Sequence, residues 1–120
     1  MQLLFTESLE GDGAGLNLLR GKVVKLPNSV KIPHMGWNTL HITKQTDLFE
    51  GVNEGSFVYF VHSYYPSDLD RDVVAAETTY GVTFASIVAK RNVYGTQFHP
   101  EKSGETGLKI LKNFFNIVKR

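Results

Sequence analysis

A histidine and a glutamate separated by one proline, His99-Pro100-Glu101, are the residues of this sequence best suited to acid–base chemistry. The proline fixes a turn directly after an expected strand, so both side chains leave the end of that strand at a defined angle. A carboxylate close to an imidazole holds the ring tautomer and stabilises the imidazolium, as in a nucleophile–histidine–acid triad. The same pattern also fits an ordinary surface pair, so the triad interpretation depends on what surrounds it.

These residues do not include a recognisable nucleophile for such a triad. The sequence has no cysteine, which excludes a disulfide, a cysteine-based zinc site and a thiol nucleophile from it. No Gly-x-Ser-x-Gly elbow is present, so serine hydrolysis lacks its signature. His62 and Ser63 could start a Ser–His pair, but they fit better as residues that position a ligand or satisfy backbone groups. No third ligand is spaced near His99 and Glu101, so we expect no metal site.

Three other features are weaker candidates for a functional role. The glycine-rich stretch 11–15 has no strand before it and no Gly-Lys-Ser/Thr after it, so it predicts a helix exit rather than a phosphate loop. His34 and His41 fit structural or interface roles. Trp37 is the only tryptophan, and it could either close the core or anchor a partner.

The elements that must position these residues are mostly strands. Alternating or continuous apolar runs bounded by Gly, Pro and turn residues predict strands at 21–26, 39–42, 57–61, 73–78, 84–89 and 93–98. Residues 57–61 are apolar at every position, which predicts a central strand covered on both faces. Tight turns at 80–81 and 91–92 predict that the last three strands are antiparallel neighbours.

Two helices are expected, one at each end. Met1, Leu4, Phe5 and Leu9 recur at helical spacing and predict a helix over 1–9. Ser103 is expected to cap the second helix. The apolar face of that helix is expected to be formed by Leu108, Leu111, Phe115 and Val118, widened by Ile110, Phe114 and Ile117.

Length and composition set the class of the protein. The 120 residues, 13.5 kDa, make one domain at most, and 42% hydrophobic with 21% charged residues is a globular composition. A net charge of +1 argues against a strongly basic nucleic-acid binder. No apolar run approaches the ~20 residues needed to cross a bilayer, and no basic stretch precedes an apolar one at the start. We therefore expect a soluble, cytoplasmic protein.

Four segments taken together resemble a known family. Met-Gln-Leu-Leu-Phe at 1–5, Pro-His-Met-Gly-Trp-Asn at 33–38, Tyr-Phe-Val-His-Ser-Tyr at 59–64 and Gln-Phe-His-Pro-Glu-Lys at 97–102 occur in that order. The combination resembles the class I (triad) glutamine amidotransferases over essentially the whole chain. The second segment favours the members that act in histidine biosynthesis, with another class I amidotransferase as the alternative.

The resemblance implies a fold, and it implies that the front part of that fold is missing from these residues. The expected class is α/β: the C-terminal part of a doubly wound, mostly parallel sheet with added antiparallel strands. In the family the first segment directly follows a Gly-x-Cys-x-Gly nucleophile elbow. Residues 1–120 are therefore expected to be an incomplete amidotransferase domain, with the nucleophile cysteine upstream. Such a chain should be aggregation-prone or dependent on a partner, because the strand at 57–61 would lose its cover.

The resemblance also implies roles for individual residues. His99 corresponds to the general base and Glu101 to the carboxylate that orients it. The positions implied to bind glutamine are Gln2, Ser63 and Tyr64, and those implied to face the partner are Trp37, Asn38, Tyr59 and Lys102. No metal or organic cofactor is implied.

The implied activity is hydrolysis of glutamine to glutamate, with the ammonia passed to a (βα)₈-barrel cyclase partner. Without a cysteine, the chain by itself is expected to be inactive. Two further interpretations stay open: a non-catalytic remnant that docks on the barrel, and an incomplete coding sequence.

Overall fold

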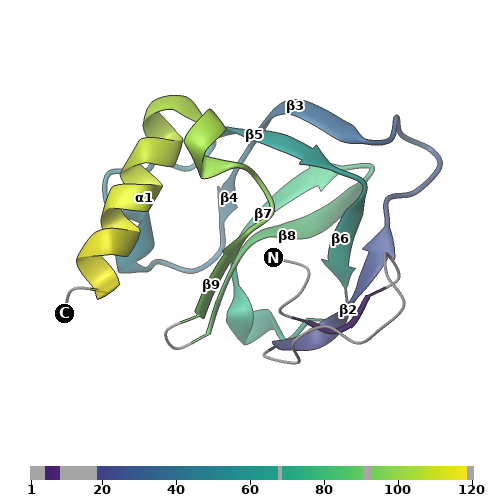
Figure 1. Ribbon diagram of the computed structural model, residues 1–120, viewed down its shortest axis with the longest axis horizontal. Coiled ribbons are helices and arrows are strands. Elements are labelled where there is room, and N and C mark those ends of the chain that lie inside the picture. Colours follow the sequence, from purple (N-terminus) through teal and green to yellow (C-terminus); the bar gives the residue numbers. More distant parts are fainter. Residues whose placement is uncertain (1–4, 9–18, 68, 91–92, 119–120) are drawn as a thin grey trace.

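The computed structural model of the protein describes residues 5–8, 19–67, 69–90 and 93–118 (Figure 1). The strands are β1 Phe5–Ser8, β2 Leu19–Lys25, β3 His34–Thr39, β4 His41–Ile42, β5 Phe57–His62, β6 Tyr64–Ser67, β7 Val74–Tyr80, β8 Val82–Lys90 and β9 Val93–Thr96. The helix α1 spans Gly104–Val118, and short 3₁₀ turns lie at η2 Asp47–Phe49, η3 Arg71–Val73 and η4 Pro100–Lys102. In this described part, no helix is long and apolar enough to cross a membrane.

The strands form three small sheets rather than one large one. Their orders are β1-β2-β6, β3-β5 and β4-β7-β8-β9. Only the β1–β2 pair among the described strands is parallel. The expected mostly parallel sheet is therefore wrong for this part of the chain. Parallel neighbours need crossover connections of a dozen or more residues, whereas a single residue, Gly81 with φ 74°, joins β7 to β8.

The antiparallel arrangement of the last three strands is confirmed. β8 pairs with β7 on one side and with β9 on the other. The turn expected at Tyr80–Gly81 is present, because Gly81 takes the left-handed conformation that glycine adopts without penalty. The turn expected at 91–92 lies outside the described residues.

The strand expected at 39–42 is divided between two sheets. Thr39 ends β3, which pairs with β5, and His41 begins β4, which pairs with β7. Leu40 lies at the crossing, is 1% exposed, and donates its backbone N–H to the carbonyl of Ser56 (2.9 Å). The buried leucine holds the chain where it passes from one sheet to the other.

The expectation that residues 57–61 form a strand covered on both faces is also wrong. β5 pairs with β3 in a two-stranded sheet, and its burial alternates along the strand. Val58 and Phe60 are fully buried on the inner face, whereas Phe57 is 58% exposed. A run that is apolar at every position thus belongs to a strand with one core face and one exposed apolar face.

The first segment differs from the predicted helix. Of the residues expected in a helix over 1–9, those at 5–8 form strand β1, and residues 1–4 and 9 lie outside the described part. A nine-residue helix is marginal without tertiary support. Pairing with β2 instead gives the backbone of β1 hydrogen-bond partners along one edge.

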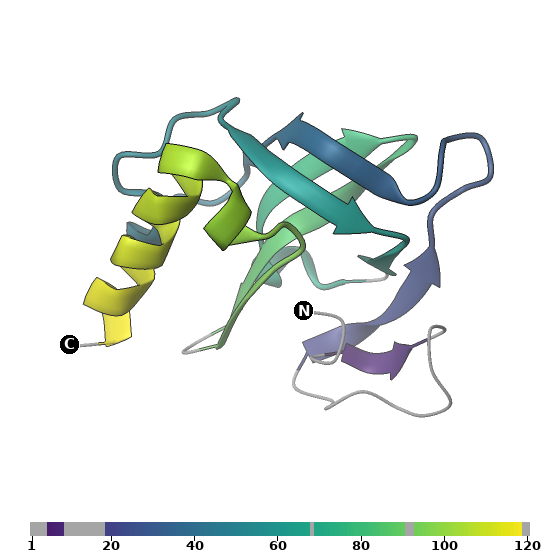
Figure 2. The same cartoon turned by 45° about the horizontal axis from the view of Figure 1, so that its top comes forward.

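The core lies between the β3–β5 pair, the β7–β8 pair and α1 (Figure 2). Its largest cluster contains Phe60, Phe84, Ile87, Phe98 and Ile110. The face of α1 turned to the core differs from the expected one, because Leu108 and Phe115 are 59% and 60% exposed.

A close contact at the start of α1 explains this orientation of the helix. A Cβ on Gly107 would lie 1.9 Å from the carbonyl oxygen of Pro100 and 2.8 Å from Cβ of Ser103. Only glycine lets the first turn of the helix approach η4 so closely. This approach sets the helix with Gly107 and Ile110 inward.

A chain of hydrogen-bonded side chains crosses the inner face of the β3–β5 pair. Nδ1 of His62 lies 2.9 Å from the carbonyl oxygen of Tyr64, which can only accept, so His62 donates from Nδ1. Nε2 of His62 is then the acceptor for Nδ1–H of His34, 2.8 Å away. Nδ2 of Asn38 lies 3.4 Å from Nε2 of His34, a long contact of the right polarity. Both imidazoles are neutral in this arrangement.

Burial shifts the titration of both histidines. His34 is 3% exposed and stacks between Phe60 and Tyr80, with ring centroids 4.8 Å and 3.9 Å away. Burial, and to a lesser degree the neighbouring His62, lowers the pKa of His34 from 6.5 to about 4. Burial also lowers the pKa of His62, opposed by its hydrogen bond to the Tyr64 carbonyl.

We expect Gly107→Ala to destabilise the chain by about 1–3 kcal/mol, although alanine is the better helix former by about 1 kcal/mol. The added methyl would overlap the Pro100 carbonyl. The measurement is the urea midpoint of unfolding, with Asn116→Ala on the exposed side of α1 as a control that should stabilise slightly. A stabilised Gly107→Ala variant would contradict the close contact.

We expect the stability of the chain to fall as the pH is lowered from 6.5 to about 4. The unfolded chain binds a proton at His34 in this window and the folded chain does not. The free energy of unfolding therefore falls by about 3 kcal/mol across the window. Urea unfolding at several pH values measures the slope. His34→Asn should flatten it. A slope unchanged by His34→Asn would count against the buried neutral pair.

Candidate functional site

The structure brings His99 and Glu101 together directly after the last strand. His99 precedes η4, and Nδ1 of its ring lies 3.0 Å from Oε1 of Glu101. The two side chains are 43% and 56% exposed, so the pair stands at the surface of the described structure. With Nδ1 engaged by the carboxylate, Nε2 is the ring atom that can take a proton from a nucleophile and return it. The contact has the geometry expected of the base and the acid in a triad.

Four hydrogen bonds fix the turn that carries this pair. The N–H of His99 donates to the carbonyl of Tyr59 (3.0 Å), and the N–H of Lys102 donates to the carbonyl of His99 (3.0 Å). The hydroxyl of Ser103 donates to the His99 carbonyl (2.6 Å) and accepts from the N–H of Tyr59 (2.9 Å). The turn is thereby attached to the edge of β5 at one residue, Tyr59.

Ser103 lies directly before α1 as expected, but the hydrogen bonds of its hydroxyl go to Tyr59 and His99 and not to the first turn of the helix. Its carbonyl accepts from the N–H of Gly107 (3.1 Å), as expected for a residue that precedes α1. Its hydroxyl, however, holds Tyr59 and His99. A serine before a helix predicts a cap, and nothing in the local pattern indicates that its hydroxyl reaches a strand 44 residues earlier.

Trp37 and Tyr59 lie side by side on the exposed face of the β3–β5 pair. They are cross-strand partners, and their rings meet edge to face with centroids 5.7 Å apart. Trp37 is 55% exposed, so the alternative that it closes the core is wrong. Met35 and Phe57 are similarly exposed and lie on the same face by register. We call these four residues, Met35, Trp37, Phe57 and Tyr59, the outer face.

The other two residues expected at the partner surface are separated from each other. Lys102 is exposed and belongs to η4, the same turn as Glu101. Asn38 is turned to the opposite side of β3, where its Nδ2 donates to the carbonyl of Thr79 (3.0 Å). The structure therefore does not bring the Asn38 side chain to the outer face.

Of the three residues expected to bind glutamine, Ser63 and Tyr64 lie at the junction of β5 and β6. The carbonyl of Ser63 accepts from the N–H of Leu26 (2.8 Å), and Tyr64 pairs with Lys25 of β2. The expectation that His62 satisfies a backbone group at the end of β5 is confirmed by its bond to the Tyr64 carbonyl. Gln2 lies outside the described residues.

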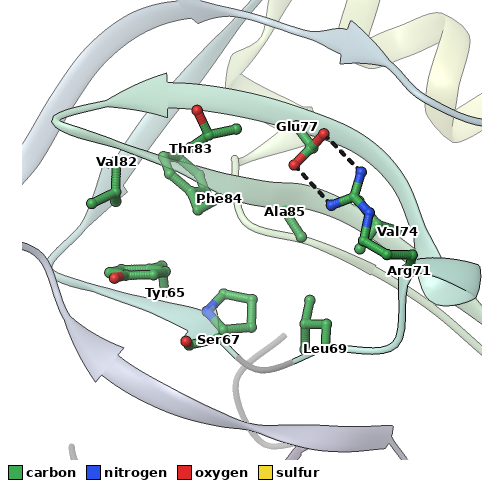
Figure 3. Close-up of a pocket in the computed structure, with 11 residues that line it drawn as sticks. Tyr65, Ser67, Leu69, Arg71, Val74, Glu77, Val82, Thr83, Phe84 and Ala85 are labelled. Carbon is green, nitrogen blue, oxygen red and sulfur yellow. Dashed lines mark hydrogen bonds and ion pairs between the residues drawn. The ribbon is translucent and has the colours of Figure 1, made fainter.

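A cavity of about 350 Å³ lies elsewhere, between β6 and the β7–β8 pair (Figure 3). None of His99, Glu101, Ser63 and Tyr64 lines it. Its charged residues are Arg71 and Glu77, whose guanidinium and carboxylate form two hydrogen bonds of 3.1 Å with each other. Because these charges satisfy each other, the cavity presents no unpaired charge from them to a ligand.

Comparison with known proteins places this geometry in a family. Residues 1–118 match the family described as glutamine amidotransferase class-I. A relative from Archaeoglobus fulgidus, named imidazole glycerol phosphate synthase subunit HisH, is 56% identical over 100% of this chain and 61% of its own length. The subunits of the same name from Caldanaerobacter subterraneus subsp. tengcongensis and Methanocaldococcus jannaschii are 52% and 49% identical, over 99% and 98% of this chain.

A solved structure matches the fold as well. It is a Thermoplasma acidophilum protein provisionally named as a GMP synthase subunit, with a TM-score of 0.67 and 25% identity over 82% of this chain and 49% of that one. The chain spans about 60% of the length of the curated relatives it matches. With a family match over nearly all of its residues and a His–Glu pair set as in a triad, the chain belongs to the class I glutamine amidotransferases.

Proposed function

We propose that this protein hydrolyses glutamine to glutamate as the glutaminase subunit of an imidazole glycerol phosphate synthase. In this role it passes ammonia to a (βα)₈-barrel cyclase partner for histidine biosynthesis. The observation that carries the proposal is the 3.0 Å contact between His99 and Glu101. Its support comes from relatives of that name about 50% identical over nearly the whole chain.

The chemistry proposed for His99 is proton transfer at Nε2. A cysteine supplied by residues outside this sequence would give its thiol proton to Nε2, and the thiolate would attack the carboxamide carbon of glutamine. Glu101 stabilises the resulting imidazolium through Nδ1. Nε2–H then protonates the leaving nitrogen, which departs as ammonia, and the base next activates the water that cleaves the thioester to glutamate.

The substrate is proposed to be held by Gln2, Ser63 and Tyr64. Ser63 and Tyr64 are backed by the buried histidine chain, since His62 bonds the Tyr64 carbonyl. A carbonyl fixed by a buried imidazole keeps its orientation, which suits a backbone that must present groups to an amino acid.

The outer face and Lys102 are proposed to dock on the barrel. Exposed aromatic residues grouped in one patch are typical of interface anchors. The patch adjoins the site, since Tyr59 holds the backbone of His99. Asn38 is proposed to support this surface from behind by fixing β3 to the carbonyl of Thr79.

A second candidate function is that of a non-catalytic protein that docks on the barrel without glutaminase chemistry. The absence of cysteine from the sequence favours it. The exposed outer face is compatible with either function. The two functions differ in what happens when a nucleophile is supplied.

We expect glutaminase activity to depend on supplied residues that carry the cysteine. In a chimera, which we call the completed protein, the part of the Archaeoglobus fulgidus relative that this chain does not cover is placed before residue 1. The completed protein should release glutamate from glutamine, and the 120-residue chain should not, because it has no thiol to attack. His99→Ala should lower kcat by at least ~10³-fold and Glu101→Gln by less.

The assay is coupled detection of glutamate, with His41→Ala, at an exposed histidine, as the control. Glutamate release by the chain alone would overturn the missing-nucleophile argument. Near-full activity of both site variants would remove the triad assignment and leave the non-catalytic docking protein as the better proposal.

We expect Trp37→Ala in the completed protein to weaken binding to the proposed barrel cyclase partner by about 1–4 kcal/mol, because an exposed aromatic anchor is lost. Its melting temperature should change little, since the indole is 55% exposed. Calorimetric titration measures the affinity. Phe115→Ala is the matched control, an aromatic residue 60% exposed on α1. Equal effects of the two substitutions would show that the outer face has no special part in docking.

A further inference from the structure

The chain passes from one sheet to another at a single residue, Ser63. β5 ends at His62 and belongs with β3, whereas β6 begins at Tyr64 and pairs with β2 (Figure 1). The carbonyl of Ser63 accepts from the N–H of Leu26 (2.8 Å), which attaches this crossing to the end of β2. Ser63 and Tyr64 are each only half-buried, so a small molecule can reach them. We call these two residues the corner.

The side chain of His62 holds the corner from inside. Its ring lies on the inner face of β5, where the residue is 7% exposed, and its Nδ1–H donates to the carbonyl of Tyr64 (2.9 Å). The Ser63 carbonyl belongs to the peptide group before Tyr64, and the Tyr64 carbonyl belongs to the one after it. Because a peptide group is planar, the bonds to these two carbonyls orient both peptide groups of the corner completely.

His34 determines which nitrogen of His62 carries the proton. It lies directly opposite His62 in the β3–β5 pair, and its Nδ1–H donates to Nε2 of His62 (2.8 Å). The proton of His62 is thereby kept on Nδ1, the nitrogen that faces Tyr64. The ring of His34 is itself stacked between Phe60 and Tyr80. Burial lowers the pKa of both histidines, which keeps the pair neutral near pH 7.

The strand that ends at the corner also holds the catalytic pair. The N–H of His99 donates to the carbonyl of Tyr59 in β5 (3.0 Å). At ~3.3 Å per residue, Ser63 lies about 13 Å further along the chain from Tyr59. An imidazole side chain and an extended glutamine molecule, placed end to end, span a distance of this order. The spacing suits a substrate with its carboxamide at His99 and its amino-acid end at the corner.

We propose that His62 is a positioning residue for glutamine, which acts by orienting the two peptide groups of the corner. The proposal rests on the proposed function and deepens it, since it names what sets the backbone that receives the amino-acid end of the substrate. His62 acts through that backbone and not by contact with the reacting atoms. The turn that carries His99 and Glu101 is attached separately, at Tyr59, so losing the His62 bond should affect substrate binding more than the chemical step.

Two amide substitutions of His62 in the completed protein separate this role from core packing. Asparagine places its amide nitrogen near the position of Nδ1, whereas the longer side chain of His62→Gln places it near that of Nε2. His62→Gln should therefore raise the KM for glutamine at least tenfold with kcat within threefold, because the Tyr64 carbonyl loses its donor. His62→Asn should keep both constants within threefold. Packing alone gives the opposite order, since asparagine leaves the larger cavity.

Ile87→Val in β8 is the control for a general loss of stability. Ile87 is 0% exposed and belongs to the same core cluster as Phe60, and it lies outside the corner. The melting temperature of this variant should fall while KM stays within twofold. Should His62→Gln fail to fold, His62→Leu fills the place of the ring without offering a donor, and the same rise in KM is expected of it.

The experiment measures kcat and KM for glutamine with the proposed barrel cyclase partner present, and the melting temperature, for the completed protein and each variant. Calorimetric titration with glutamine in a His99→Ala background gives the dissociation constant without turnover, and it should rise in parallel with KM.

Two results would overturn the positioning role and leave the proposed function intact. One is an unchanged KM and dissociation constant in whichever donor-free variant folds, and the other is a rise as large or larger in His62→Asn. A completed protein with the unchanged sequence that releases no glutamate would instead overturn the proposed function, and the role of His62 with it.

Discussion

The attachment of the His99–Ser103 turn to a single residue of β5 is the constraint on which the rest of the site depends. A strand with one paired edge leaves backbone groups that must find partners on the other edge. At Tyr59 those partners are the N–H of His99 and the hydroxyl of Ser103. The position of the imidazole is thus a consequence of satisfying a strand edge, and the His99–Glu101 contact follows from the turn that this edge holds.

The inner face of the same strand is held by a chain of hydrogen-bonded side chains. Burying polar groups is costly unless each is hydrogen-bonded, and the chain from Asn38 through His34 and His62 to the Tyr64 carbonyl assigns each neutral imidazole a donor and an acceptor role. The aromatic rings of Phe60 and Tyr80 enclose His34 and keep it uncharged at neutral pH. The histidines therefore act as rigid connectors between β3, β5 and β6 rather than as reacting groups.

Local sequence patterns predicted some contacts of the structure and missed others. The antiparallel β7–β8–β9 arrangement followed from tight turns, and the His99–Glu101 contact from a proline between two polar residues. Other features depend on contacts between distant segments, which no local pattern contains. Phe57 is as apolar as Phe60, yet only tertiary packing decides that one is exposed and the other buried.

The C-terminal helix shows the same limit. Its apolar residues are spread over more than one face, so helical periodicity alone does not decide which face packs against the core. The rotation is set by one close approach, at Gly107, to a carbonyl seven residues earlier. The strand expected at 39–42 is divided for a comparable reason, since the burial of Leu40 between two sheets is a tertiary event.

The two faces of the β3–β5 pair differ in how closely they are packed. The inner face is close-packed against Phe84 and Phe98, and packed interiors transmit displacement instead of absorbing it. The outer face, with Trp37 and Phe57 more than half exposed, is where an approaching surface can push. The edge of β5 away from β3 is hydrogen-bonded at Tyr59 to the His99–Ser103 turn. His99 is therefore bonded to a strand whose inner face is closely packed and whose outer face is exposed.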